Sequence, residues 1–189
     1  MLRAILKSGL LLFVFTVVSV LFVSITQDNT KERIQDNERQ LLIQRLGELV
    51  NDYDNDILAD RYTKSLMVHG IEQSVNIYPA KKSNQIFAYL IEHTYPNGYS
   101  GNIRLLTGIK TNQQLLGVRV IAHKETPGLG DKVELRKSNW IKQFTGLSLN
   151  NPTKDNWKVK RDGGVFDAFT GATITPRAIV TASQQILTL

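Results

Sequence analysis

The residue types best suited to chemistry lie together in one short stretch, residues 167–176, which reads Asp-Ala-Phe-Thr-Gly-Ala-Thr-Ile-Thr-Pro. The pattern predicts a strand end, a tight turn at Gly171 and a helix start, with Thr175 as the cap and Pro176 as the first helical residue. A helix start offers unpaired backbone N–H groups and the positive end of the helix dipole. These features suit a phosphate-sized anion near Thr173. From the residue types alone, a plain turn with a threonine cap is the simpler interpretation.

The same stretch resembles the flavinylation motif of FMN-binding domains, in which an aspartate and two spacer residues precede Ser/Thr-Gly-Ala-Thr. In that family the last threonine carries FMN through a phosphoester, which a separate flavin transferase installs from FAD. The resemblance implies that Thr173 is the acceptor in this chain, with Thr175 as the runner-up. The other motif positions are filled by Asp167, Thr170, Gly171 and Ala172.

A second stretch, residues 125–130, reads Glu-Thr-Pro-Gly-Leu-Gly and is similar to a loop of the same family. Taken alone, a loop rich in glycine and proline is more often a plain connection. The two motifs in this order are more specific than either one. The resemblance implies a loop that closes over the flavin ring, with Leu129 as an apolar platform, Thr126 as a hydrogen-bond partner and Glu125 ordering the loop.

Both motifs, the apolar N-terminal segment and the length of 189 residues together resemble the G subunit of Rnf-type ion-translocating electron transport complexes. The C subunit of the sodium-translocating NADH:quinone reductase shares the motif and the anchor but is usually longer. The resemblance implies a covalent-FMN electron carrier that works with other subunits, in a complex that links ferredoxin and NAD to ion movement. The alternatives are the FMN-binding domain of another membrane reductase and a non-redox, anchored binding or assembly module.

The N-terminal segment has the composition of a membrane anchor. Residues 9–25 form an apolar run of 17 residues without a charge, and a transmembrane helix over residues 1–27 is therefore predicted. A cleaved signal peptide is the competing interpretation, which the length of the run and the lack of a small-x-small cleavage site disfavour. Arg3 and Lys7 precede the run, so the positive-inside rule predicts a cytoplasmic N-terminus and a periplasmic domain at a bacterial inner membrane.

Beyond the anchor, the chain is expected to form an amphipathic helical segment, 28–69, and an FMN-binding domain, 70–189. The apolar spacing indicates a helix that is capped at Asn29 and runs to about Ala59. The remaining predicted elements are strands at 86–91, 102–110, 114–123 and 157–160, a turn at 95–98, and helices at 131–144 and after the Thr-Pro pair. This order predicts an α+β fold around an antiparallel sheet, attached to a single transmembrane helix.

Several kinds of chemistry are disfavoured by composition. The chain has no cysteine, which excludes disulfides, a cysteine nucleophile and cysteine-ligated iron–sulfur clusters within it. The net charge of +6 is spread along the chain without aromatic interleaving, so no nucleic-acid partner is expected. Lys158 and Lys160 precede the flavin segment, where a solvated role and a place near the phosphate both fit. The three histidines lack metal-ligand spacing, and no metal site is expected: His69, His93 and His123.

Overall fold

The computed structural model describes residues 2–189, which divide into two compact units, residues up to Ile43 and Gln44–Leu189. The first unit is most of a single helix, α1 (Leu2–Leu49). Within the described residues, one helix is long and apolar enough to cross a membrane, and its apolar window buries no side chain in the protein. Leu11, Phe15 and Phe22 are among its exposed side chains. A soluble helix would bury such residues, so α1 is a candidate membrane span.

The predicted helical segment at residues 28–69 differs from the structure at both ends. The backbone stays helical through Asn29, so no cap forms there, and α1 ends at Leu49 rather than near Ala59. Residues 51–56 are mainly asparagine and aspartate, whose side chains bond nearby backbone groups and compete with a helix. Asp56 shows this, because its Oδ1 accepts from the N–H groups of Leu58 (3.1 Å) and Ala59 (3.0 Å). The sheet then begins before residue 70.

The last turn of α1 is part of the second unit. Leu46 is 1% exposed, and Leu49 is also buried. The Glu48 carboxylate accepts from the buried guanidinium groups of Arg45 and Arg119, both at 2.7 Å. This end of the helix is therefore fixed to the sheet by both apolar packing and ion pairs.

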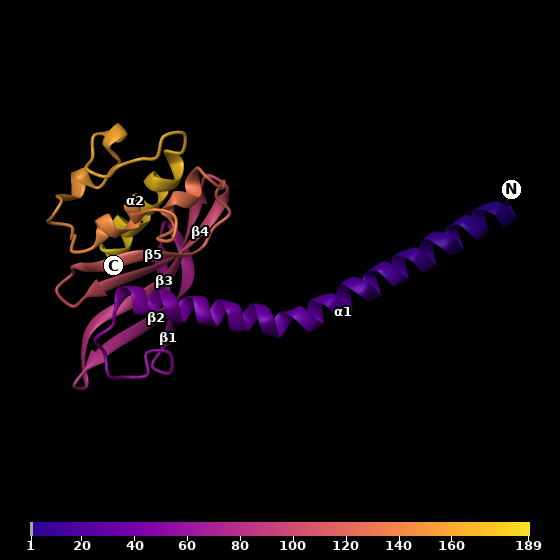
Figure 1. Cartoon of the computed structure of the whole chain (residues 1–189), viewed down its shortest axis with the longest axis horizontal. Helices are drawn as coiled ribbons and strands as arrows, with labels where there is room; N and C mark the ends of the chain where they lie inside the picture. The colour runs from indigo at the N-terminus through magenta and orange to yellow at the C-terminus, as the bar shows by residue number, and fades with distance from the viewer. Residues whose placement is uncertain (1) are drawn as a thin grey trace. The chain divides into compact units, whose positions relative to one another are not determined.

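A five-stranded antiparallel meander, in the order β1-β2-β3-β4-β5, forms the centre of the second unit (Figure 1). The strands are β1 (Tyr62–Val68), β2 (Ile71–Lys82), β3 (Gln85–Gly98), β4 (Gly101–Lys110) and β5 (Leu115–Ala122). This confirms the predicted α+β class with an antiparallel sheet. It also confirms the strands expected at 102–110 and 114–123.

The turn predicted at residues 95–98 lies three residues further along the chain, at 98–101. β3 continues to Gly98, which pairs with Gly101, and the hairpin turn is at Tyr99 and Ser100. The register shifts between Tyr95 and Gly98. Proline has no N–H to donate to the neighbouring strand, so within a sheet it is tolerated at irregularities of this kind. This explains how Pro96 can lie inside a strand.

One face of the sheet is covered by helix α2 (Ile174–Ile186) and by short 3₁₀ turns. The turns are η1 (Gly130–Val133), η2 (Asn139–Phe144), η3 (Lys154–Asn156) and η4 (Lys160–Asp162). The shared core includes Leu105 of β4, Val118 of β5, Phe144, Trp157 and Ile179. This layer holds the segments that carry both sequence motifs.

Two predicted elements of this layer were wrong in type. The helix expected at 131–144 is two separate 3₁₀ turns, because Ser138 starts a new one by accepting the Trp140 N–H at 3.0 Å. The strand expected at 157–160 is reduced to one bridge, in which Val159 pairs with Phe166 before the chain turns into η4. Buried aromatic side chains, rather than a regular hydrogen-bond ladder, hold this part of the chain.

Candidate functional site: a pocket at the start of helix α2

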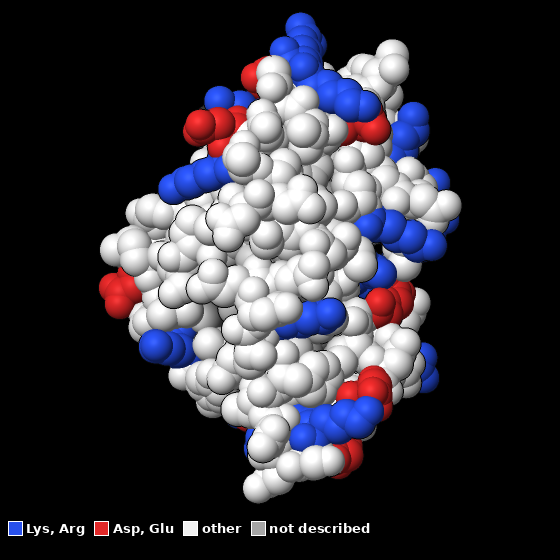
Figure 2. Space-filling model, turned by 90° about the vertical axis from the view of Figure 1, so that its left-hand side faces the viewer, with Lys and Arg blue, Asp and Glu red and all other residues white. Residues whose placement is uncertain are grey.

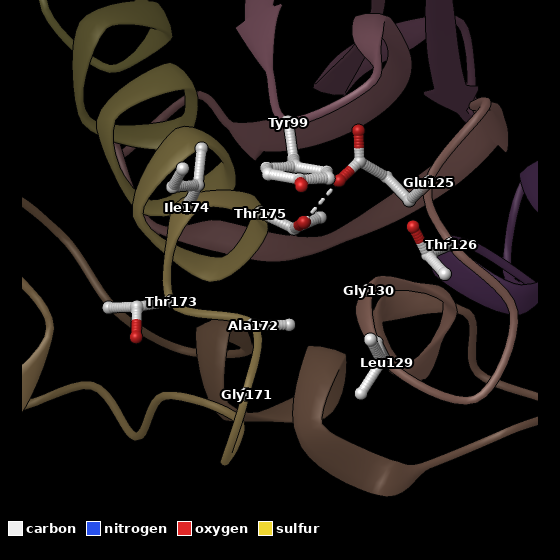
Figure 3. A pocket seen from close by; sticks show the side chains of 10 residues that line it. All are labelled: Tyr99, Glu125, Thr126, Leu129, Gly130, Gly171, Ala172, Thr173, Ile174 and Thr175. Atoms are coloured by element: carbon white, nitrogen blue, oxygen red, sulfur yellow. Dashed lines mark hydrogen bonds between the residues drawn. The ribbon is translucent and has the colours of Figure 1, made fainter.

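Three segments that are distant in sequence surround one pocket of about 300 Å³ (Figure 3). They are the β3–β4 turn, the loop between β5 and η1, and the chain entering α2. The lining residues are Tyr99, Glu125, Thr126, Leu129, Gly130, Gly171, Ala172, Thr173, Ile174 and Thr175. The fold therefore brings both sequence motifs to one cavity.

Glu125 fixes one wall of this pocket. It is 4% exposed, and its Oε1 accepts from the N–H of Ser100 at 2.9 Å. Its Oε2 accepts from the hydroxyl of Thr175, and its own N–H donates to Nδ1 of His123 at 3.0 Å. One carboxylate thus joins the loop to the β3–β4 turn and to α2.

The rest of this wall is a tight turn. The carbonyl oxygen of Thr126 accepts from the N–H groups of Leu129 (3.2 Å) and Gly130 (3.1 Å). Leu129 is left 42% exposed, with its side chain at the pocket. A Cβ atom on Gly130 would lie 2.8 Å from the Thr175 hydroxyl and 2.9 Å from the Glu125 Cβ, so only glycine fits there without a shift.

The opposite wall is the chain from Gly171 to Thr173, which leads into α2. Gly171 has φ +81°, the left-handed region that favours glycine, and a Cβ there would approach Leu129 to 3.5 Å. Thr173 is the N-cap residue, and its carbonyl accepts the Arg177 N–H at 3.2 Å. Its hydroxyl makes no capping bond, and the residue as a whole is half-buried. Figure 3 shows its side chain across the pocket from Thr126.

The predicted start of this helix was wrong by two residues. α2 begins at Ile174, so Thr175 is its second residue rather than its cap, and Pro176 is its third rather than its first. The Thr175 side chain is buried and donates to Glu125, which prevents it from capping the helix. Pro176 is tolerated there because the N–H groups of the first turn have no intrahelical partner.

Two motif residues do not line the pocket. Asp167 is exposed and pairs with Lys160 at 2.6 Å, and its carbonyl accepts from Nε1 of Trp140 at 2.8 Å. Thr170 is also exposed. Sequence reasoning missed Tyr99, Gly130 and Ile174 as lining residues. Gly130 and Ile174 could have been predicted, because they lie in or next to the motifs. Tyr99 could not, because only the pairing of β3 with β4 brings its turn beside Glu125.

The histidines behave differently from one another. His69 Nε2 lies 3.0 Å from Nδ1 of His93, a contact that their positions in the sequence did not indicate. Burial lowers the pKa of His93 to about 3, so this side chain is neutral at physiological pH. His123 contacts Glu134 at 3.0 Å. Over residues 2–189, no three His, Asp or Glu side chains are grouped so that they could hold a metal ion.

Comparison with known families assigns both parts of the chain. The family model described as the FMN-binding domain matches residues 98–188, a range that contains every pocket residue. The model of the RnfG N-terminal region matches residues 1–49, which correspond to α1. Fold and site together therefore define a flavoprotein of the FMN-binding domain class with an N-terminal apolar helix.

Curated relatives narrow this class to one family. The chain is 46% identical over 187 residues to the G subunit of the ion-translocating oxidoreductase complex of Vibrio cholerae, covering 96% of this chain and 88% of that protein. It is 43% identical to the Pseudomonas aeruginosa protein of the same name (98% and 88%) and 42% identical to the Shewanella amazonensis one (98% and 87%). The chain belongs to the family of G subunits of ion-translocating oxidoreductase complexes. This confirms the resemblance to that family, rather than to the sodium-translocating reductase or a non-redox module.

Proposed function

We propose that this chain carries FMN covalently on Thr173 and passes electrons within a membrane-bound, ion-translocating oxidoreductase complex. The single observation that carries the proposal is the pocket at the start of α2, which joins Thr173 to the Glu125–Gly130 loop. The other subunits of that complex are its partners. A link between ferredoxin and NAD is the net reaction that the family resemblance implies.

The pocket residues fit FMN in size and in chemistry. A volume of about 300 Å³ is at the lower end of the range for small-molecule sites. Leu129, Ala172 and Ile174 give apolar surface for a flat ring, and the hydroxyl of Thr126 adds a polar contact. The start of α2 offers free N–H groups to a phosphate. Bound FMN supplies the transfer of one or two electrons, and the chain supplies binding, orientation and shielding from water.

Attachment requires a donor and an enzyme, which are FAD and a flavin transferase in this proposal. The hydroxyl oxygen of Thr173 bonds to the phosphorus on the riboflavin side of FAD, the bond from this phosphorus to the bridging oxygen breaks, and AMP leaves. The hydroxyl proton passes to a base of the transferase. Thr173 is favoured over Thr175 because the Thr175 hydroxyl is buried and bonded to Glu125. It is favoured over Thr170 because Thr170 is outside the pocket.

Intact mass of the purified chain tests attachment, and peptide mapping tests the residue. The expected result is one added FMN on the peptide containing Thr173. A chain without added mass, isolated from cells that contain an active flavin transferase, would contradict covalent attachment. FMN mapped to Thr170 or Thr175 would contradict the assigned acceptor alone.

The proposal places the N-terminus in the cytoplasm and the FMN domain on the periplasmic side of a bacterial inner membrane. It rests on Arg3 and Lys7 at the short N-terminal flank of α1. A flavin transferase that acts on Thr173 must then work outside the cytoplasm. Protease added to intact spheroplasts should degrade the domain. Protection that is lost only when the inner membrane is broken would reverse the orientation.

A further inference from the structure

Three consecutive residues of η4 each contact the segment that carries the proposed acceptor. Lys160 Nζ lies 2.6 Å from Oδ1 of Asp167. Arg161 Nη1 lies 3.5 Å from Oγ1 of Thr173, and Asp162 accepts two hydrogen bonds from Arg177 of α2 at 2.6 and 2.9 Å. The short turn η4 therefore lies directly against the start of α2.

Backbone hydrogen bonds and close packing hold η4, and therefore the backbone of Arg161, in one position. Lys160 N–H donates to the Phe166 carbonyl at 2.7 Å, and Gly164 N–H donates to the Val159 carbonyl at 3.1 Å. A Cβ on Gly164 would lie 1.9 Å from the Lys158 carbonyl oxygen, so the two chain segments cross at a distance that only glycine permits. Val159 and Phe166 are buried on either side of the turn. Core packing thus positions η4 without any contribution from Arg161.

Of the two cations of η4, Lys160 is held in an ion pair, and Arg161 is the one that faces the acceptor hydroxyl. Lys160 and Arg177 are each paired with a carboxylate. Arg177 holds the pKa of Asp162 below its usual value, mainly through their hydrogen bonds, so this carboxylate is engaged as an anion. Among residues 2–189, the hydroxyl of Thr173 is the side-chain partner found for the exposed guanidinium of Arg161. The charge of Arg161 also helps to lower the pKa of Asp162, but its side-chain contact is with the acceptor hydroxyl, an arrangement that suits a phosphate.

We propose that Arg161 is a positioning residue for the flavin phosphate, whose oxygens accept hydrogen bonds from its guanidinium at Thr173. This inference rests on the proposed FMN site. It adds a residue outside both sequence motifs and separates the binding of the phosphate from the binding of the ring. The ring is held by the Glu125–Gly130 loop and the residues opposite, and the phosphate is held by η4 and the start of α2. Asp162 and Arg177 act through Arg161 by holding η4 against the helix.

Binding of free FMN and free riboflavin to the full-length chain in detergent tests the role, because the two ligands differ only by the phosphate. The chain is produced in cells without flavin transferase, and dissociation constants are measured by flavin fluorescence. In R161Q, FMN should bind about tenfold more weakly, the effect of losing one charge-assisted hydrogen bond, and riboflavin should bind as before. The matched control is K154Q, which removes an exposed charge of η3 beside Gln184, near the other end of α2, and should change the affinity for FMN less than twofold.

Each other outcome is decisive. An equal loss for FMN and riboflavin in R161Q would make Arg161 structural, and an unchanged affinity for FMN would remove its role altogether. An equal weakening of FMN binding by K154Q would replace the specific contact by general charge attraction. Absence of binding of both ligands to the unsubstituted chain would contradict the FMN pocket itself, which distinguishes failure of the proposed function from failure of this inference.

Discussion

The two walls of the pocket are built in opposite ways. The wall from Glu125 to Gly130 is held firmly at its two buried ends, by a carboxylate bonded to Ser100 and Thr175 and by a glycine that has no room for a side chain. The wall from Gly171 to Thr173 is lightly held, because none of its three residues is buried. An acceptor that enters the active site of a flavin transferase, as we propose for Thr173, needs such access. The firm wall can keep the shape of the pocket while the other wall is modified.

The two walls of the pocket also differ in the charged side chains that lie beside them. Figure 2 shows Lys and Arg standing singly or beside Asp and Glu on one face of the molecule, with wide uncharged surface between them. Two such ion pairs, Lys160–Asp167 and Arg177–Asp162, lie beside the lightly held wall.

The strongest test of the comparison is Thr173→Ala, which should abolish covalent flavin because the acceptor oxygen is removed. The fold should persist, because the Thr173 hydroxyl makes no capping bond. Intact mass measures the loss of flavin, and circular dichroism measures the fold. Thr175→Ser, which retains the hydroxyl bonded to Glu125, is the control and should stay loaded. Covalent flavin on the alanine variant would show that another residue is the acceptor.

The second test breaks the firm wall. Thr175→Val keeps the side-chain volume and removes the donor to the buried Glu125 carboxylate. We expect the free energy of unfolding to fall by about 1–3 kcal/mol, the cost of leaving a buried acceptor without its partner. Chemical denaturation of the detergent-solubilised chain measures this, with Thr175→Ser as the matched control. Stability equal to that of the serine variant would mean that this wall is no firmer than the other.

A smaller loss of stability is expected from Gly171→Ala on the lightly held wall. The left-handed backbone at Gly171 should cost alanine about 1 kcal/mol of folding free energy, while the new methyl group meets Leu129 at ordinary contact distance. Gly171→Asn should cost less, because asparagine tolerates this conformation better. The same denaturation experiment compares the two variants. If Gly171→Ala lowered the free energy of unfolding much more than Thr175→Val does, the wall from Gly171 to Thr173 would be the more firmly held of the two.

The smallest effect on stability is expected from Asp167→Ala. Asp167 pairs with Lys160 at the surface, and exposed ion pairs contribute about 0–1 kcal/mol. The flavinylated fraction should fall more than the stability does, because we assign Asp167 to recognition by the transferase. Flavin occupancy by mass and thermal unfolding are measured on the same sample. Full occupancy in the variant would remove Asp167 from that role.

Local sequence signals predicted the middle of the sheet well. Apolar alternation and the polar turn between them located β4 and β5 to within two residues. The motif residues that line both walls of the pocket were named from sequence, through resemblance to FMN-binding domains, and their role in binding FMN stays a prediction. Their meeting in one pocket follows from the fold, since residues 125–130 and 171–175 are joined by a contact between Glu125 and Thr175.

Tertiary contacts explain what the sequence could not show. The helix start was misplaced because Thr175 has the type of a cap, while its side chain is drawn inward by a glutamate fifty positions earlier. The 3₁₀ turns replace a helix because each short segment is fixed by buried aromatic and aliphatic side chains rather than by its own periodicity. Arg161 was missed for a related reason, because its nearness to Thr173 depends on the crossing at Gly164.

The burial of Leu46 and Leu49 and the pairing of Glu48 with Arg119 bear on how this domain can be produced without detergent. A fragment that begins at the first strand would expose the surface on which these leucines pack. It would also leave the buried guanidinium of Arg119 without its carboxylate. A buried charge that loses its partner destabilises a protein by about 3–5 kcal/mol. A soluble version of the domain should therefore begin no later than Gln44, within the helix, rather than at Tyr62.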